Sequence, residues 1–313
     1  MNKPHVTGTF IQPGTFLYYS QGRWLQHMEY LLEAGIDTII IQWTAETPYG
    51  KMKSTYCPIS FSCEKEKYCS EHPEFLENLL QAAHEKGMKL FVGLNLSDEW
   101  WEFACSRDDW NQKQAQIGAQ MAAEIYDTYK ARYPETLYGW YFSWEMFNGM
   151  YGQEDKAISF LNLYLDALNE IAPEMPIMLS PFVRSVGGPP AQAQEEWTKV
   201  FAGAHFRDGD IFCCQDAVGA EHITIEELDG YFAALKAAAD TKEGLLFWAN
   251  TECFRRVSEG FFNPAPVERF IRQMEIAQPY VSGYVTFAYS HYYAPDVARN
   301  RKMHEEYLRY LAQ

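Results

Sequence analysis

The chain alternates eight times between a short apolar segment and a longer amphipathic segment. The apolar segments, which are typical of β-strands, cover residues 6–12, 38–43, 89–95, 137–145, 176–181, 210–216, 245–252 and 282–290. Helices are expected after them at residues 21–34, 73–87, 109–132, 154–171, 191–205, from 224, from 263, and at 297–311. Strands that alternate with helices form parallel sheets, and eight such units predict a closed (β/α)8 barrel.

The connections between these segments favour the same fold. Turns from helix to strand are short, as at Gly35-Ile36 and Gly87-Met88, whereas several segments that follow strands are long and rich in aromatic residues, Gly or Pro. In a (β/α)8 barrel those long segments build the site. A doubly wound open sheet is the alternative, but no Gly-x-Gly-x-x-Gly sequence follows the first strand. The eight units fill the 313 residues, so we expect an α/β fold with a single (β/α)8 TIM barrel as the catalytic domain over residues 1–313.

Local signals predict where several helices begin. Ser20 is expected to cap the first helix, and Thr224 with Glu227 has the spacing of a capping box. Asn263-Pro264 combines an N-cap residue with proline at the first helical position. The residues between the second strand and His72 are expected to form a long loop.

Composition limits the classes of partner. The formal net charge is −16, from 26 Lys and Arg against 42 Asp and Glu. Nucleic acid and anionic membranes are therefore unfavourable partners, and a neutral or cationic ligand fits better. No apolar run is long enough for a membrane span. The N-terminus, Met-Asn-Lys-Pro-His, has no apolar signal region, which predicts a cytoplasmic protein. The sequence leaves the oligomeric state open.

Two glutamates end apolar strands that are fourth and seventh in the expected order. Glu145 closes the run 137–145 and Glu252 closes the run 245–252. Catalytic groups of barrel enzymes sit at these carboxyl ends, and strands four and seven lie across the mouth from each other. Two carboxyl groups there suit the cleavage of a glycosidic bond, although either one could instead cap a helix or pair with an arginine.

Other polar residues at strand ends are candidates for binding sugar hydroxyl groups. Asp216 could orient a glutamate, bind hydroxyl groups or cap the turn to Gly219, and His291 is as consistent with a structural role as with a proton relay. The substrate-binding candidates are Gln12, Gln42, Trp43, Asn95, Trp100, Trp101, Asp216, Trp248, Asn250, Tyr289 and His291.

Aromatic residues add to this prediction. Trp100-Trp101 follows the third strand and could form a platform for a sugar ring, with simple loop packing as the alternative. Trp43, Trp248 and one of this pair are expected to line the cavity that holds Glu145. Arg184 and Arg255-Arg256 could bind a uronate or a sulfate, but ordinary ion pairing is the favoured interpretation.

No cofactor or metal is implied. Cys57, Cys63 and Cys69 are six residues apart, whereas structural zinc sites use tighter Cys-x₂₋₄-Cys pairs, so we interpret these residues as loop thiols. The sequence contains no His-x-His or His-Glu-x-x-His, which disfavours a barrel metallohydrolase.

Glutamates that end strands four and seven of an eight-fold barrel resemble clan A of the glycoside hydrolases. The resemblance implies that Glu145 is the acid/base and Glu252 the nucleophile, with retention at the anomeric carbon. Members of the clan usually have Asn directly before the strand-four glutamate, whereas this chain has Trp144. A second resemblance, to an uncharacterised bacterial family of glycosidase-like TIM-barrel proteins, covers the whole chain. Its motifs are Gly8-Thr-Phe-Ile-Gln12, Gly35-Ile-Asp-Thr-Ile-Ile-Ile-Gln-Trp43, Gln215-Asp216-x-x-Gly219 and Trp248-x-Asn-x-Glu252.

The sequence therefore predicts a glycoside hydrolase that acts on an oligosaccharide or glycoside with two carboxyl groups. Glu145 is expected to donate a proton to the leaving oxygen, and Glu252 to attack or stabilise the anomeric carbon. Burial among aromatic residues is expected to raise the pKa of Glu145. An isomerase or lyase that acts on a free sugar is the first alternative, and it requires a closed pocket for one ring. A non-catalytic carbohydrate-binding barrel is the second, and it would hold the glutamates too far apart to share one bond.

Overall fold

The computed structural model describes residues 3–150, 152–296 and 301–313, and its centre is a closed barrel of eight parallel strands. The barrel order is β1-β14-β11-β10-β9-β8-β6-β2, which follows the chain once around the ring. These strands are β1 (Gly8–Ile11), β2 (Thr38–Ile41), β6 (Lys89–Gly93), β8 (Leu137–Phe142), β9 (Ile177–Leu179), β10 (Ile211–Gln215), β11 (Leu246–Glu252) and β14 (Gly283–Phe287). The expected (β/α)8 TIM barrel is thereby confirmed.

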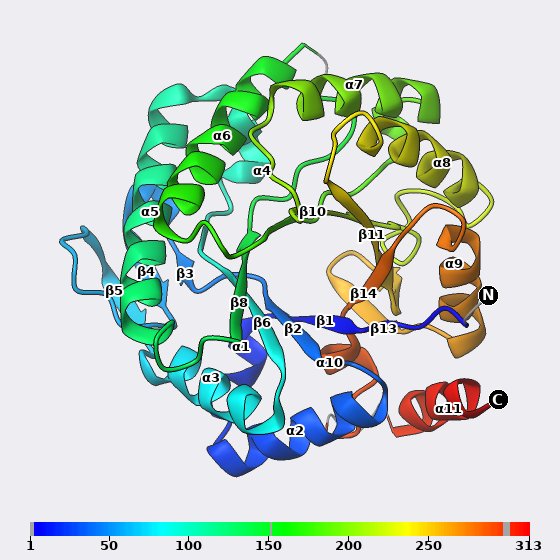
Figure 1. Ribbon diagram of the computed structural model, residues 1–313, viewed down its shortest axis with the longest axis horizontal. Coiled ribbons are helices and arrows are strands. Elements are labelled where there is room, and N and C mark those ends of the chain that lie inside the picture. The colour runs from blue at the N-terminus through cyan, green and yellow to red at the C-terminus, as the bar shows by residue number, and fades with distance from the viewer. Residues whose placement is uncertain (1–2, 151, 297–300) are drawn as a thin grey trace.

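A ring of helices surrounds the strands (Figure 1). Its long helices are α2 (Gln21–Glu33), α3 (Glu74–Lys86), α5 (Asp108–Tyr129), α6 (Glu154–Ile171), α7 (Pro190–Gly203), α8 (Leu228–Ala239), α9 (Val267–Ala277) and α11 (Arg301–Ala312). Short helical segments also follow strands: α1 (Pro13–Phe16), η1 (Pro48–Gly50), α4 (Trp100–Phe103), η2 (Ala104–Ser106), η3 (Ser185–Gly187) and α10 (Tyr289–Tyr292). None of the helices in the described ranges is both long and apolar enough to cross a membrane.

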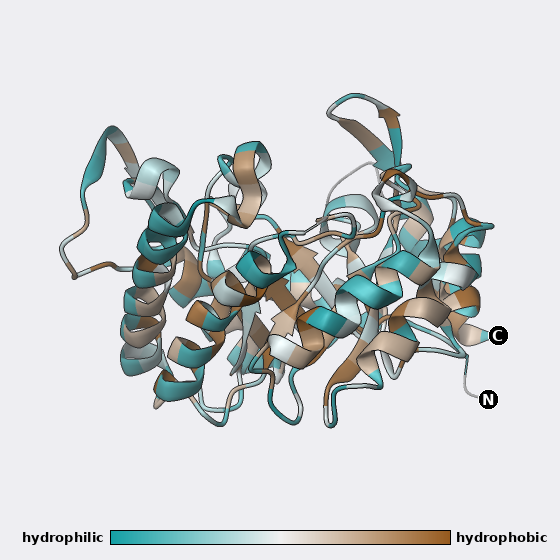
Figure 2. Ribbon diagram, turned by 90° about the horizontal axis from the view of Figure 1, so that it is seen from above, coloured by the Kyte–Doolittle hydropathy of each residue, from teal (hydrophilic) through white to brown (hydrophobic). Residues whose placement is uncertain are grey.

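Two hydrophobic layers stabilise the barrel. The inner layer fills the space inside the strands, and the outer layer lies between the strands and the helices, so strand residues alternate between the two. The inner layer contains Phe10, Ile40, Phe91, Tyr141, Met178, Ile211, Cys213 and Val285. In Figure 2, which is turned by 90° from Figure 1, the central strands are largely hydrophobic and the surrounding helices carry both hydrophilic and hydrophobic residues.

The residues after β2 form a small sheet rather than the expected long loop. The sheet has the order β5-β4-β3-β7 and adds strands to the mouth of the barrel. Its strands are β3 (Ala45–Glu46), β4 (Met52–Thr55), β5 (Lys65–Glu71) and β7 (Asn95–Leu96). Glu124 of α5 holds the turn between β4 and β5, because its carboxylate accepts from the main-chain N–H groups of Ser60 and Phe61, both at 2.8 Å. This prediction failed because the pairing depends on contacts distant in sequence.

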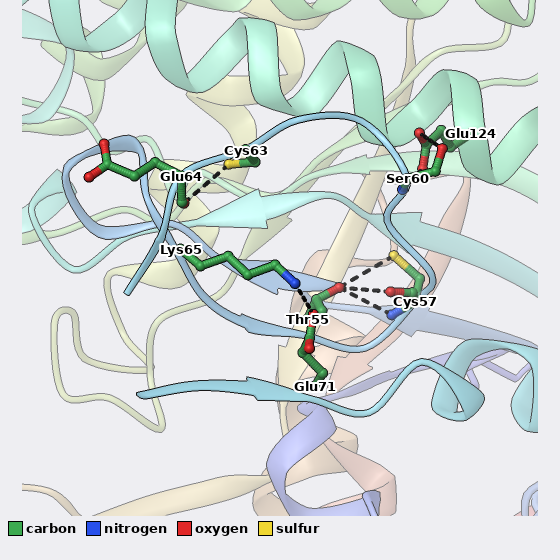
Figure 3. Close-up of polar contacts among 8 residues, drawn as sticks. All are labelled: Thr55, Cys57, Ser60, Cys63, Glu64, Lys65, Glu71 and Glu124. Atoms are coloured by element: carbon green, nitrogen blue, oxygen red, sulfur yellow. Dashed lines mark hydrogen bonds and ion pairs between the residues drawn. The ribbon is translucent and has the colours of Figure 1, made fainter. Parts of the chain in front are cut away.

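The three regularly spaced cysteines lie in or beside this small sheet. Cys57 is buried, its main-chain carbonyl accepts from the Thr55 hydroxyl at 2.8 Å, and burial raises the pKa of its thiol to about 12. The Cys63 thiol instead donates to the Glu64 carbonyl at 3.6 Å, and Figure 3 shows the two sulfur atoms in different parts of the turn. In the described part of the chain, no three His, Cys, Asp or Glu side chains are grouped to hold a metal ion.

Two more local predictions need correction. Asn263 and Pro264 do not start a helix but end strand β13 (Phe261–Pro264), which pairs with β12 (Phe254–Ser258) in an antiparallel hairpin. Helix α9 begins only at Val267, and α8 begins at Leu228, so the capping-box contact from Thr224 to Glu227 closes a turn before that helix. By contrast, Ser20 caps α2 as expected, because its side chain accepts from the main-chain N–H of Arg23.

The last unit also differs from its predicted bounds. Strand β14 ends at Phe287 rather than at residue 290, and the chain turns at once into α10. Helix α11 starts at Arg301, and residues 297–300 of the predicted helix lie outside the described ranges.

Candidate active site

A cavity of about 450 Å³ opens at the carboxyl ends of the barrel strands, and we call it the Glu145 cavity. Both glutamates singled out by the sequence line it, and β9 and β10 separate their strands in the ring. Its polar wall consists of Gln12, Gln42, Glu145, Arg184, Gln215, His222 and Glu252. Its size lies within the range of small-molecule sites, which is roughly 300–1,000 Å³.

Glu145 lies three residues beyond the end of β8, on a segment fixed by its main chain. The indole N–H of Trp100 donates to the Glu145 carbonyl at 2.9 Å. The side-chain amide of Gln215 donates to the Glu145 carboxyl at 3.0 Å. Burial raises the pKa of Glu145 from 4.5 to about 7, and the hydrogen bond from Gln215 only partly opposes this rise. The carboxyl group can therefore exchange a proton near neutral pH.

Glu252 is the last residue of β11 and is only 2% exposed. One of its carboxyl oxygens accepts from the main-chain N–H of Ala220 at 2.8 Å. Burial and the adjacent carboxyl of Asp216 raise its pKa, whereas the Ala220 N–H group and the guanidinium of Arg269 favour the charged form. Glu252 therefore has direct contacts that stabilise an anion, although burial opposes ionisation.

Asp216 lies behind Glu252 rather than in the cavity, and it is 1% exposed. Its carboxyl accepts from the amide of Gln273 and, at 3.3 Å, from the main-chain N–H of Glu252. Burial raises the pKa of Asp216, while the hydrogen bond from Gln273 lowers it. The structure thus gives Asp216 contacts that orient Glu252 and none with the cavity.

Gln12 and Gln42 share one wall of the cavity. The amide N–H of Gln12 donates to the Gln42 side-chain carbonyl at 3.0 Å. His291 supports this wall from behind, because its Nε2 accepts from the main-chain N–H of Gln12 at 3.0 Å. Burial lowers the pKa of His291 to about 4, so its ring is neutral and can accept this bond.

The expected aromatic residues separate into different environments. Trp101 is 54% exposed and lines the Glu145 cavity, whereas Trp100 is 1% exposed and packs against Trp144. Trp43 lines a different cavity of about 360 Å³ beside Glu99. Trp248 lies inside the barrel against Gly283, below the mouth. The four indoles therefore do not share one wall, and Trp101 is the candidate platform.

Three further candidates are buried inside the protein and hydrogen-bonded to other protein groups, although the side-chain oxygen of Asn250 has no partner. Asn95 is 0% exposed, and its amide donates to the Gln114 side chain at 2.8 Å. The amide of Asn250 donates to the Ser180 hydroxyl at 3.1 Å, and the Tyr289 hydroxyl lies 2.8 Å from Nδ1 of His304. Their expected place at the mouth is therefore corrected: each holds barrel elements together.

The cavity also contains residues that the sequence reasoning did not select for binding. Phe182 is central, because its ring packs against Phe147, Trp101 and His222 with centroid separations of 5.4, 6.3 and 5.1 Å. Gln215 could have been found from strand alternation, since it lies on the same face as Cys213, which faces the barrel interior. The sequence offered no comparable signal for Phe182, which follows the end of a three-residue strand.

Solved structures with this fold include several glycoside hydrolases. A "putative alpha-L-fucosidase" from Bacteroides thetaiotaomicron VPI-5482 has a TM-score of 0.79 at 22% identity, with 98% of this chain and 94% of that chain covered. The endo-β-1,4-mannanase from Thermotoga petrophila has a TM-score of 0.59 at 11% identity, with 92% and 68% covered. A GH18 chitinase from Pseudoalteromonas aurantia has a TM-score of 0.55 at 12% identity, with 98% and 99% covered. These likenesses confirm the resemblance to glycosidase-like barrels for the fold.

The family is defined by a sequence match over almost the whole chain. Residues 6–299 match DUF4434, described as a domain of unknown function, and the chain belongs to this family. The sequence has no match among curated proteins.

Proposed function

We propose that this protein hydrolyses a glycosidic bond in the Glu145 cavity. The observation that carries the proposal is that two carboxyl groups, one just beyond the end of β8 and one at the end of β11, line one sugar-sized cavity with an exposed indole beside them. Glycosidases need two such groups, one to protonate the leaving oxygen and one to act on the anomeric carbon or on water.

Glu145 is the general acid in this proposal. A group with a pKa of about 7 carries a proton for about half of the molecules at neutral pH, which suits proton transfer at that pH. In the first step Glu145 gives its proton to the leaving oxygen while the bond between that oxygen and the anomeric carbon breaks. In the second step the Glu145 carboxylate takes a proton from water, the hydroxyl of that water bonds to the anomeric carbon, and in the retaining route the bond from that carbon to the Glu252 carboxylate, formed in the first step, breaks.

Glu252 is the group that attacks or stabilises the anomeric carbon. The N–H of Ala220 fixes one oxygen of its carboxyl, while burial and the charge of Asp216 hold its pKa above the ordinary value, so the ionised form that attack requires increases as the pH rises. Retention follows if Glu252 forms a bond to the anomeric carbon, and carboxyl groups about 5–5.5 Å apart are needed for that. Retention is the outcome we favour, and Asp216 acts by orienting Glu252.

The test starts with a panel of aryl glycosides and oligosaccharides. We expect Glu145→Gln and Glu252→Gln to fold and to lose at least about 10²-fold in rate on any substrate that the wild type cleaves. The anomer released first, followed by NMR, separates retention from inversion. Azide should rescue Glu252→Ala to a glycosyl azide of inverted configuration and rescue Glu145→Ala with retained configuration, because the small anion replaces a different carboxyl in each case.

Each other outcome contradicts part of the proposal. Wild-type activity in Glu252→Gln would remove Glu252 from the mechanism. Conversion of a free sugar without cleavage of any glycoside would favour an isomerase or lyase. Sugar binding without turnover anywhere on the panel would favour a non-catalytic binding barrel.

A further inference from the structure

We propose that the sugar bound in the Glu145 cavity carries a negatively charged group, a carboxylate or a sulfate ester, and that Arg184 binds it. This inference rests on the proposed function and adds the chemical class of the substrate. It differs from the expectation, drawn from net charge, that a neutral or cationic ligand fits best.

Arg184 lies where two cavities meet. Its side chain lines both the Glu145 cavity and a neighbouring cavity of about 490 Å³, which we call the side cavity. The main-chain N–H of Arg184 donates to the Asn148 side chain at 2.8 Å, so its backbone is fixed. Its guanidinium lies 4.1 Å from the centre of the Phe147 ring, and its Nε donates to the Asn148 carbonyl at 3.4 Å. The Arg184 guanidinium is thus positioned by an aromatic ring and a carbonyl, neither of which neutralises its charge.

Arg184 has no carboxylate counter-ion among the described residues, although the chain is rich in Asp and Glu. The sequence has 42 Asp and Glu, and other arginines use them, as Arg132 does with Glu77 and Arg207 with Asp210. Within the described ranges, no carboxylate oxygen lies within 4.0 Å of the Arg184 guanidinium. Ordinary ion pairing, the alternative interpretation of this residue, is therefore not what holds it.

His222 lies on the same wall as Arg184, and its pKa reflects the charge of that arginine. His222 lines the Glu145 cavity and stacks on Phe182 with a centroid separation of 5.1 Å. Burial, then the positive charges of Arg256 and Arg184, lower the pKa of His222. Both arginines therefore act electrostatically on a side chain of the cavity wall. A guanidinium presents paired N–H donors that match a carboxylate or a sulfate.

The arrangement also orients an anionic sugar. Trp101 and Phe182 provide an aromatic wall beside Arg184, while Glu145 and Glu252 lie in the same cavity. Carboxylates repel an anion, so a charged substituent is placed most favourably toward Arg184 and away from Glu252. The ring would then rest near Trp101 with its neutral side toward the two glutamates.

The experiment compares matched sugars that differ in one group. Methyl glycosides of glucose, galactose and mannose, in both anomeric forms, are each paired with the uronic acid and with the 6-sulfate of the same sugar. Ligand-observed NMR with the intact protein measures the dissociation constant, and released methanol in the same samples reports hydrolysis. The uronic acids and the sulfates form separate arms, which identify the anion that the cavity accepts.

Three variants test the role of the residue. We expect wild type to bind the preferred anionic member about 10- to 100-fold more tightly than its neutral counterpart, which is the range for hydrogen bonds to a charged group. Arg184→Gln should lose this preference, Arg184→Lys should keep part of it, and Arg255→Gln should keep all of it. Arg255 is the matched control because it is an exposed arginine outside the lining of the cavity. Thermal midpoints confirm that the variants fold.

The outcomes separate the two proposals. If no anionic sugar binds more tightly than its neutral counterpart, including the case in which none binds, this inference is overturned. It is also overturned if Arg184→Gln keeps the preference. Tighter binding of an anionic sugar without methanol release supports the inference but counts against the hydrolase. Hydrolysis of neutral glycosides that is unchanged by Arg184→Gln supports the hydrolase but counts against the inference.

Discussion

The burial of Glu145 should make the folded protein less stable at alkaline pH, and this can be measured without any substrate. Burial raises the pKa of Glu145 from 4.5 to about 7 in the folded state. Folding therefore favours the protonated carboxyl, whose stabilising contribution is fully present below the unfolded pKa and is lost as the pH rises through about 7. At about 1.4 kcal/mol per pKa unit, the loss amounts to about 3 kcal/mol.

Glu145→Gln keeps the size of the side chain and is uncharged at every pH, so it should escape this loss. Between about pH 4 and pH 8.5, we expect the free energy of unfolding of the variant to gain about 3 kcal/mol relative to wild type. Urea denaturation followed by tryptophan fluorescence gives both values. Glu226→Gln, at an exposed position, controls for the loss of one negative charge. If the free energies of unfolding of variant and wild type differ by the same amount at both pH values, the argument is refuted.

Two more predictions concern the neighbours of this carboxyl. Gln215→Met removes the amide that donates to Glu145 at 3.0 Å, so the pKa of Glu145 and the alkaline limb of kcat/KM should rise by roughly one unit. Gln42→Met, in the same cavity, is the control, and an unchanged limb in Gln215→Met would contradict the prediction. Gly139→Ala should cost about 1–3 kcal/mol in urea denaturation, because an added Cβ would lie 2.8 Å from the Pro176 carbonyl and against the Phe91 ring. A variant as stable as wild type would show that the barrel interior has spare room.

The fold was predictable where its signals are local. Helix α6 has the bounds that the sequence predicts, and α2 starts after the expected cap at Ser20. The failures depend on pairing between strands, which the residues of one segment do not specify by themselves. Asn263-Pro264 is compatible with a helix start and with the end of a hairpin strand, and its pairing with Phe254 decides for the strand. The small sheet after β2 forms for the same reason, since β3 pairs with β7 about 50 residues further on.

The candidate site was predictable to the level of its strands but not of its side-chain directions. The sequence placed Glu145 and Glu252 at one mouth, and the structure places both in one cavity. Asp216 and Gln215 were both at a strand end, yet successive residues point to opposite faces, so only Gln215 enters the cavity. Asn95 lies in the small sheet, and its buried side-chain amide donates a hydrogen bond to Gln114 of α5 rather than to a ligand. The direction of the Asn95 side chain depends on a sheet that the sequence did not predict.

The anionic-sugar proposal is compatible with a negative net charge because electrostatic screening makes charge a local property. At physiological ionic strength the screening length is about 8 Å, so most of the acidic residues behind a net charge of −16 have little effect on the cavity. What a bound sugar meets is the wall itself, where Arg184 is the fixed cation and the protonation of Glu145 changes near neutral pH. We still expect the acidic surface to disfavour polyanions such as nucleic acids, which contact many surface charges at once. A small anionic sugar is therefore compatible with both facts, since it meets the positive wall only after it has entered the mouth.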